Sequence, residues 1–203
     1  MKMIQRYLCL AVLSGLTACS TMSAQECLSA DWYSLGLADG AAGYTMSFFN
    51  ERAGDCAKHG VVANRQIYAQ ARQQGLKRYC TQENGYQQGY HGRTYRGVCR
   101  GRAAKRFLSA YQKGKRIYEQ KKQVNDLQKK IRATERDIAR HDDEQYRLEK
   151  QIISQDDKGK RAVLLLELNR IRHQMSKLEA KKIRLQQQYR TAQKRLNRIS
   201  PQQ

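Results

Sequence analysis

The chain has 203 residues, of which 39 are Lys or Arg and 18 are Asp or Glu, so its formal net charge is +21 at pH 7. Only 40% of the residues are hydrophobic and the mean hydropathy is -0.85, which argues against a large two-layer enzyme core. The single long apolar run lies at the N-terminal end, which excludes a bundle of membrane-spanning helices.

Residues 1–18 have the features of an export signal. Lys2 and Arg6 precede an apolar stretch of about ten residues, from Tyr7 to Leu16. That length is typical of the core of a signal peptide and is too short to span a bilayer. We therefore keep residues 1–18 out of the predicted fold.

The segment that ends the signal is Leu16-Thr17-Ala18-Cys19, which resembles the lipobox of bacterial lipoproteins. The resemblance implies that the Cys19 sulfur carries diacylglycerol and that acyl chains such as palmitate anchor the mature chain, with residues 19–30 as a lipidated linker. Ser20, in place of Asp, implies sorting to the outer membrane, facing the periplasm. The alternative is an ordinary secretory signal, which would leave Cys19 as a plain thiol.

Four cysteines remain in the exported part of the chain, and an even number in an oxidising compartment predicts two disulfide bonds. They are Cys27, Cys56, Cys80 and Cys99. We favour the pairs Cys27–Cys56 and Cys80–Cys99, because each pair brackets one segment rich in glycine and tyrosine. A zinc site is the alternative, since Cys56-x2-His59 has ligand-like spacing. Oxidation argues against it, so we expect no metal.

Residues 31–102 form the predicted head, which is rich in glycine and tyrosine. The pattern Tyr33-x2-Gly36-x3-Gly40 recurs in related forms at Tyr68, Tyr86 and Tyr111. Offsets of three, four and seven place these residues on one face of a helix, where glycine lets another backbone approach closely. The intervals of 35, 18 and 25 residues between the copies argue against a solenoid of fixed period. We predict a small helical head, with β-hairpins as the alternative.

A set of spaced motifs runs through the same segment. They are Asp31-Trp32-Tyr33-x2-Gly36-x2-Asp39, Tyr68 to Gly75, Cys80, Tyr86-x2-Gly89-x2-Gly92 and Cys99. Together they resemble a family of bacterial envelope lipoproteins that contain a domain of unknown function. The resemblance covers about residues 30–118 and stops before the charged tail. It implies no particular activity, so no catalytic residue is carried over.

Trp32, Tyr33 and Asp39 are the candidate ligand-groove residues of the head. An aromatic ring beside a carboxylate is a common arrangement for binding sugars. The alternative is that Trp32 anchors the core of a domain with few other large side chains, while Asp39 makes local hydrogen bonds.

Residues 103–203 are predicted to form a basic coiled-coil hairpin. Val124, Leu127 and Ile131 belong to a 3-4 heptad ladder in the first arm. A second ladder begins at Leu164 and has Lys182 as its only polar position. The two ladders are out of phase, and residues 154–160 between them have the composition of a turn.

An antiparallel pairing of the two arms follows from this break. It would place Leu148 near Leu166 and Ile131 near Ile183. A parallel homodimer with a stutter is the alternative, because the first arm has a weak seam. The expected fold class is therefore all-α, with a small disulfide-stapled helical head followed by a long antiparallel helical hairpin.

Positive charge is concentrated in the tail. Residues 19–100 hold 9 basic and 6 acidic residues, whereas residues 101–203 hold 28 and 12, a net charge of +16. Such an excess predicts attraction to polyanions. Nucleic acid is the usual partner of so basic a chain, but export removes it as a physiological partner. The envelope polyanions that remain are peptidoglycan carboxylates, anionic lipid headgroups and lipopolysaccharide.

Common catalytic motifs are missing from the sequence, which has no HExxH, no G-x-S-x-G and no P-loop. The paired acids Asp142-Asp143 and Asp156-Asp157 are sequence neighbours and are not spaced to converge across a cleft. We therefore expect a non-enzymatic lipoprotein without a cofactor, whose coiled coil engages envelope polyanions. The alternative is a scaffold whose coiled coil recruits a protein partner of an envelope machine.

Overall fold

The computed structural model describes residues 22–200, and within this range every regular element is an α-helix. The predicted all-α fold is therefore confirmed, and the alternative of β-hairpins is wrong for the described residues. The expected signal peptide and its lipidated residue, Cys19, lie outside this range. None of the helices in residues 22–200 combines the length and the apolar character needed to cross a bilayer.

The described chain divides into two compact units. The first holds the residues up to Cys80 together with 96–98, and the second holds residues 81–95 and those from Cys99 onward. The division falls after Cys80 and not at the predicted residue 102, because α5 (Gln82–Tyr90) packs on the long helix α6 (Gly101–Ser154).

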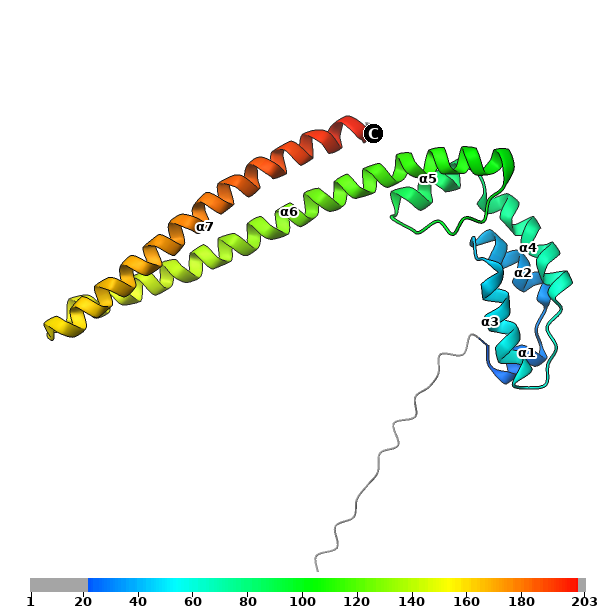
Figure 1. Cartoon of the computed structure of the whole chain (residues 1–203), viewed down its shortest axis with the longest axis horizontal. Coiled ribbons are helices and arrows are strands. Elements are labelled where there is room, and N and C mark those ends of the chain that lie inside the picture. Colours follow the sequence, from blue (N-terminus) through cyan, green and yellow to red (C-terminus); the bar gives the residue numbers. More distant parts are fainter. Residues whose placement is uncertain (1–21, 201–203) are drawn as a thin grey trace, which may run out of the picture. The chain divides into compact units, whose positions relative to one another are not determined.

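The first unit contains α1 (Ala24–Leu28), α2 (Trp32–Ala41), α3 (Met46–Ala57) and α4 (Arg65–Tyr79) (Figure 1). Residues 24–28 are helical and not the expected linker. A capping box starts α1, because the Ser23 hydroxyl accepts from the Glu26 backbone N–H and the Glu26 carboxylate accepts from the Ser23 N–H at 2.7 Å. The disulfide bond between Cys27 and Cys56 then joins α1 to α3, with a Cα–Cα distance of 5.3 Å.

Aromatic rings form the core of this unit. Trp32 of α2 meets Phe49 of α3 edge to face, with ring centroids 5.9 Å apart. Phe49 in turn packs on Tyr68 of α4, with centroids 4.8 Å apart. All three side chains are buried, so one ring from each of three helices holds the unit together.

Glycine brings the backbones of α2 and α4 into contact. A Cβ atom at Gly36 would overlap the carbonyl oxygen of Tyr68, and one at Gly40 would overlap that of Arg72. From the other side, a Cβ at Gly75 would overlap the carbonyl of Leu37. The predicted role of glycine, close approach of a second helix, is confirmed for this pair.

The second unit repeats the same contact between α5 and α6. Gly85 faces the carbonyl of Phe107, Gly89 faces that of Tyr111, and Gly114 faces that of Tyr86. The helix pairs α2·α4 and α5·α6 are thus two copies of one packing unit. Gly36 and Gly40 of the first helix recur 49 positions later, whereas Gly75 of the second helix recurs only 39 positions later. The two helices of a pair are therefore ten residues closer together along the chain in the second copy than in the first.

A glycine with positive φ follows the first helix of each pair. Gly43 has φ +74° and lies against the ring of Tyr79, and Gly92 has φ +68° and lies against the ring of Tyr118. Side-chain-bearing residues rarely adopt this conformation, and a Cβ would also meet the ring. The turn and the tyrosine therefore belong to the repeated unit.

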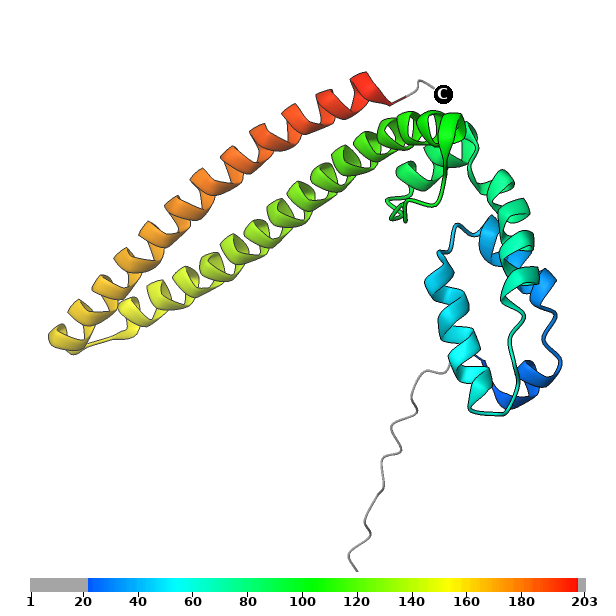
Figure 2. The same ribbon diagram turned by 45° about the vertical axis from the view of Figure 1, so that its right-hand side comes forward.

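The helices α6 and α7 (Lys158–Ile199) form the predicted hairpin (Figures 1 and 2). They are joined by residues 155–157, inside the predicted turn of 154–160. Asp157 caps α7, because its carboxylate accepts from the Lys160 N–H at 2.8 Å. The antiparallel hairpin is confirmed, and the two arms pair within one chain.

The two arms meet along an apolar seam whose register differs from the predicted one. Leu148 clusters with Leu168 and Ile171, and not with Leu166, which is 71% exposed. Ile131 packs in the cluster that contains Leu185, while Ile183 is 53% exposed. The correction has a simple cause, since the seam of α7 follows its heptad ladder and neither Leu166 nor Ile183 lies on that ladder.

Candidate anion-binding surface

Charge is distributed unevenly along the hairpin. We call residues 113–132 and 180–199 the open half and residues 133–179, which include the turn, the turn half. The open half holds 15 basic and 2 acidic residues, a net charge of +13, whereas the turn half holds 10 of each. The apolar cluster that joins Leu127 to Leu185 and Ala192 brings the two segments of the open half together.

The few carboxylates of the open half are already paired. Glu119 lies 3.9 Å from Lys115, and Asp126 lies 2.8 Å from Lys122, in both cases on the same helix. Within residues 22–200, the other 13 basic side chains of the open half have no carboxylate partner. The turn half instead carries ion pairs such as Arg172–Glu149, which joins α7 to α6 at 2.9 Å. Unneutralised charge therefore collects in the open half.

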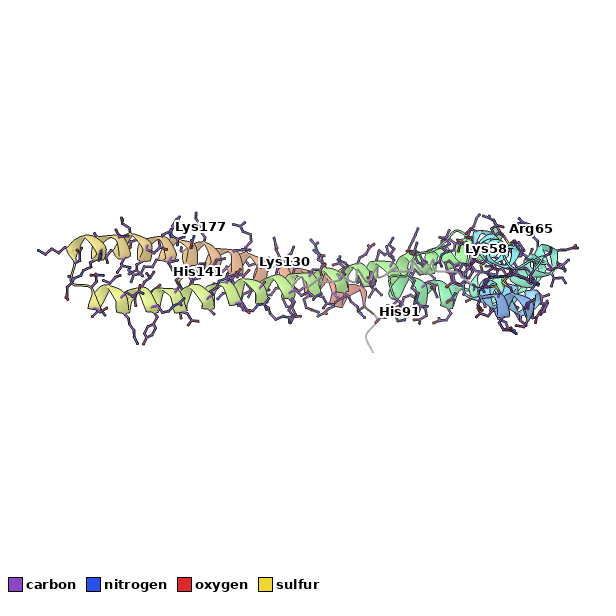
Figure 3. All side chains as sticks on the ribbon, turned by 90° about the horizontal axis from the view of Figure 1, so that it is seen from below. Lys58, Arg65, His91, Lys130, His141 and Lys177 are labelled. Atoms are coloured by element: carbon purple, nitrogen blue, oxygen red, sulfur yellow. A yellow bond between two sulfur atoms is a disulfide. The ribbon has the colours of Figure 1, made fainter. Side chains whose placement is uncertain are left out.

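Most cations of the open half point into solvent. Figure 3 shows Lys130 projecting from α6 in the open half, and His141 and Lys177 further along the hairpin in the turn half. On α7, the residues from Ala180 to Ile199 include seven cations and no acid, and only Lys182 among the cations is even partly buried. Exposed cations keep their side-chain freedom and remain available to an external anion.

A groove of about 880 Å³ lies between the two arms in the open half. Its rim carries Lys122 and Lys130 from α6 and Arg184 and Arg195 from α7. Leu127 and Ala192 also line it, together with the side chains of Gln123, Gln187, Gln188 and Thr191. The groove thus combines cationic rims with uncharged hydrogen-bonding groups.

The two acids that line the groove, Glu119 and Asp126, are each paired with a lysine of the same helix. The hydrogen bond from Lys122 lowers the pKa of Asp126, and the same bond raises the pKa of Lys122. Both groups are solvated, so the pair contributes little to stability. Its effect is to keep the Asp126 carboxylate from repelling an anion that enters the groove.

The three candidate groove residues of the head do not line a common groove, and Trp32 has the core position given as the alternative. Trp32 is buried in the aromatic core, and Tyr33 lies on the surface, where its hydroxyl bonds the amide oxygen of Gln74 at 3.0 Å. Asp39 is only 4% exposed. Successive residues of a helix face different directions, so Trp32 and Tyr33 cannot line one groove with Asp39.

Asp39 instead belongs to a buried polar cluster. Its carboxylate accepts from the Tyr68 hydroxyl at 2.6 Å and lies 3.2 Å from Arg52 of α3. Burial, together with the bond to Asp39, raises the pKa of Tyr68 well above its usual range. The cluster ties α2, α3 and α4 together, which is a structural role.

The remaining predicted site residues are the cysteines. Cys27 and Cys56 are bonded to each other as predicted. Cys80 and Cys99 are disulfide-bonded as well. A bonded Cys56 is not available to a metal, and the part of the chain that the structure describes contains no cluster of metal-ligating side chains.

The division of charge between the two halves was missed in the sequence, although a signal for it was present. No acidic residue follows Glu179 in the chain. Only the hairpin, however, brings this stretch beside residues 113–132, which have an excess of basic residues. A charge count along the sequence therefore reveals each segment but not the surface that they make together.

Comparison with known proteins supports one part of the predicted resemblance. Residues 31–116 match the sequence model of a family described as a protein of unknown function (DUF2799). The matched segment begins just before α2 and ends within α6, so it contains both glycine-packed helix pairs and leaves out most of the hairpin. No curated protein and no solved structure matches the chain. Residues 31–116 are thus similar to this domain of unknown function.

Proposed function

We propose that the chain is a non-enzymatic lipoprotein, anchored through Cys19 to the outer membrane on its periplasmic side, whose hairpin binds envelope polyanions through the open half. The observation that carries the proposal is the net charge of +13 on the open half beside zero on the turn half. The turn half of the same hairpin is also exposed to solvent and has no net charge. Exposure to water therefore does not by itself require the excess of positive charge in the open half.

The expected strength of the interaction follows from its charge. Each Lys or Arg held near an anionic membrane contributes about 1 kcal/mol, so even a few of the 13 unpaired cations give firm binding at low salt. Such binding weakens as salt is added, because the charges are exposed and are screened. The predicted lipid anchor would hold the chain close to these anions at all times.

The first test is cosedimentation of the full chain, purified in a nonionic detergent, with peptidoglycan sacculi and with vesicles that contain anionic phospholipid. We expect binding at low ionic strength that falls steeply as salt rises. Vesicles of a zwitterionic lipid serve as the control. If the chain stays in the supernatant with both anionic materials at low salt, the proposed function is wrong.

Two matched variants locate the effect. The first replaces Lys181, Arg184, Arg190 and Arg198 of the open half by Gln, and the second replaces Arg136, Arg147, Lys160 and Lys177 of the turn half. Both lower the net charge equally, and all eight side chains are exposed. We expect the first variant to lose most of the binding at moderate salt and the second to keep it. Equal losses would show that total charge, and not the open half, is responsible.

The anchor requires its own measurement. Mass spectrometry of the protein extracted from membranes should show the chain beginning at Cys19 with the added mass of diacylglycerol and a third acyl chain. Changing Cys19 to Ser should release the protein from the membrane fraction. An unprocessed N-terminus would exclude the anchored form.

The second candidate function is a scaffold that recruits a protein partner, and it is favoured by exposed apolar side chains around the turn of the hairpin. Ile153, Val163 and Leu166 are 82%, 65% and 71% exposed around the turn. Large apolar side chains gathered at one place favour a protein contact. In-cell crosslinking from position 166 separates the candidates, because one discrete protein adduct supports the scaffold.

A further inference from the structure

The groove of the open half contains more than positive charge. Arg184, Gln188, Thr191 and Arg195 follow one another at intervals of four, three and four residues, so they lie along one face of α7. The two arginines are 11 residues apart, which is about 16 Å along a helix. Between them the face offers an amide and a hydroxyl, and Gln123 lines the groove from α6.

These side chains differ in what they can bind. An arginine only donates hydrogen bonds and prefers carboxylate or phosphate oxygens. An amide donates and accepts at once. The Thr191 hydroxyl donates to the Gln187 carbonyl oxygen at 3.1 Å, so toward a ligand it is an acceptor. A ligand that satisfies both kinds of group must carry acidic groups some distance apart, with groups that both donate and accept between them.

A second, smaller opening continues the groove toward the end of α7. It has a volume of about 320 Å³ and shares Glu119 and Arg195 with the first. Arg116, Gln120 and Arg198 line it, so cations and an amide alternate there as well. The repeated arrangement suits an extended polymer better than a small ion.

We propose that this groove is a binding site for an acidic glycan, a saccharide chain that carries carboxylate or phosphate groups. The inference rests on the proposed function, because it names the class of polyanion that the open half prefers. The arginines bind the acidic groups, and Gln123, Gln188 and Thr191 hydrogen-bond the sugar hydroxyls. Inorganic polyphosphate lacks hydroxyls, so it offers no donor to the amide oxygens, which stay bonded to water when it binds.

The test measures binding of the full chain, in nonionic detergent at 0.15 M salt, to four probes. Polygalacturonate carries carboxylates on sugars, phosphorylated dextran carries phosphates on sugars, polyphosphate carries charge without sugars, and plain dextran carries neither. We expect at least one acidic glycan to bind about tenfold more tightly than polyphosphate of equal charge. Of the two acidic glycans, the one that binds more tightly identifies whether the groove prefers carboxylate or phosphate groups. If polyphosphate binds as well as both glycans, the proposal is wrong.

Charge variants separate the groove from its surroundings. Changing Arg184 and Arg195 to Gln removes two groove cations, whereas changing Lys181 and Arg190 to Gln removes two that line neither opening. All four are exposed and lack ion pairs within residues 22–200, so both variants should fold. We expect the first pair to weaken glycan binding about tenfold or more and the second about threefold or less. Equal losses of affinity in the two variants would show that the groove is not the glycan-binding site, while the proposed general binding of polyanions would still stand.

Amide variants test the sugar contact directly. Replacing Gln123 and Gln188 by Met keeps the size of both side chains and removes their hydrogen bonds. The glycan should then bind about fivefold to tenfold more weakly, while polyphosphate binding stays unchanged. Gln151→Met, outside the groove in the turn half, is the control. If glycan affinity is the same in the amide variant as in the control, the groove does not recognise sugar.

Discussion

The two glycine-packed helix pairs share their contact but differ in their surroundings. In α2·α4, the residue before Gly40 is Asp39, which binds Tyr68 and Arg52 in the buried cluster. In α5·α6, the residue before Gly89 is Gln88, whose side chain bonds Asn84 of its own helix at 2.9 Å. The first pair thus depends on a third helix and a buried charge, and the second does not.

The position of Tyr68 shows the same difference. Its counterpart in the second pair is Phe107, and both side chains are fully buried. A hydroxyl is retained only where Asp39 accepts from it. The comparison separates what the packing unit requires, which is glycine against a backbone, from what each copy has added.

The largest expected effect is loss of the shared contact. Gly36→Ala and Gly85→Ala each place a methyl group against a backbone carbonyl that cannot move away without separating the helices. We expect each to destabilise its pair by about 3 kcal/mol, measured by urea unfolding. Gly54→Ala in α3 is the control, because a Cβ there meets nothing within 4 Å, and it should stabilise by up to about 1 kcal/mol. Alanine tolerated at positions 36 and 85 would contradict the close packing.

The next effect distinguishes the two copies. Asp39→Ala leaves Arg52 and the Tyr68 hydroxyl without their shared partner and should cost about 2–3 kcal/mol. Gln88→Ala, at the corresponding place in the second pair, should cost less than about 0.5 kcal/mol. Both are measured as shifts in urea midpoint. Similar costs would mean that the buried cluster adds no stability to the first pair.

Alkaline pH should lower the free energy of unfolding of the first helix pair only. The pKa of Tyr68 is raised in the folded state, so its bound proton stabilises the fold below the ordinary tyrosine pKa of about 10, and this stability is lost as pH rises above it. Trp32, the single tryptophan of the chain, reports on this unit by its fluorescence. Tyr68→Phe should remove the dependence on pH. A wild-type urea midpoint that stays constant as pH rises above about 10 would contradict this role of Tyr68.

The smallest effect concerns the caps. Asp31 caps α2, and hydrogen bonds from Ser34 lower the pKa of its carboxyl, whereas Thr81 caps α5 and does not titrate. A lowered pKa means that the stabilisation is present above the ordinary value of about 4 and is lost as pH falls below it. Asp31→Asn should weaken the pH dependence of the Trp32-monitored transition and keep the cap. An unchanged acid profile in the variant would assign the dependence to other carboxylates.

Local signals in the sequence were sufficient for several elements. Heptad ladders and the turn composition of residues 154–160 predicted the hairpin, because the apolar spacing of a coiled-coil seam can be recognised in each arm separately. The even cysteine count predicted disulfides, and the Cys27–Cys56 bond was identified by the segment that it brackets. The face of small residues predicted close helix contact, and that contact exists in both pairs.

The sequence did not predict which residues far apart in the chain contact each other. Trp32 and Tyr33 are neighbours in the sequence, yet one lies in the core and the other on the surface, because the packing of α3 and α4 decides which side of α2 is covered. The register of the hairpin was also misjudged at Leu166, which lies off the seam.

The sequence by itself determined that this protein is helical, disulfide-bonded and ends in a basic hairpin, since propensity, cysteine count and heptad spacing act over a few turns of one chain. Only the tertiary structure decided that α5 pairs with α6, that the glycine pairs form a duplicated unit, and that Lys122 and Lys130 of α6 line one groove with Arg184 and Arg195 of α7. A glycine face accepts any backbone that fits it, and a charged segment has no partner until folding brings one beside it.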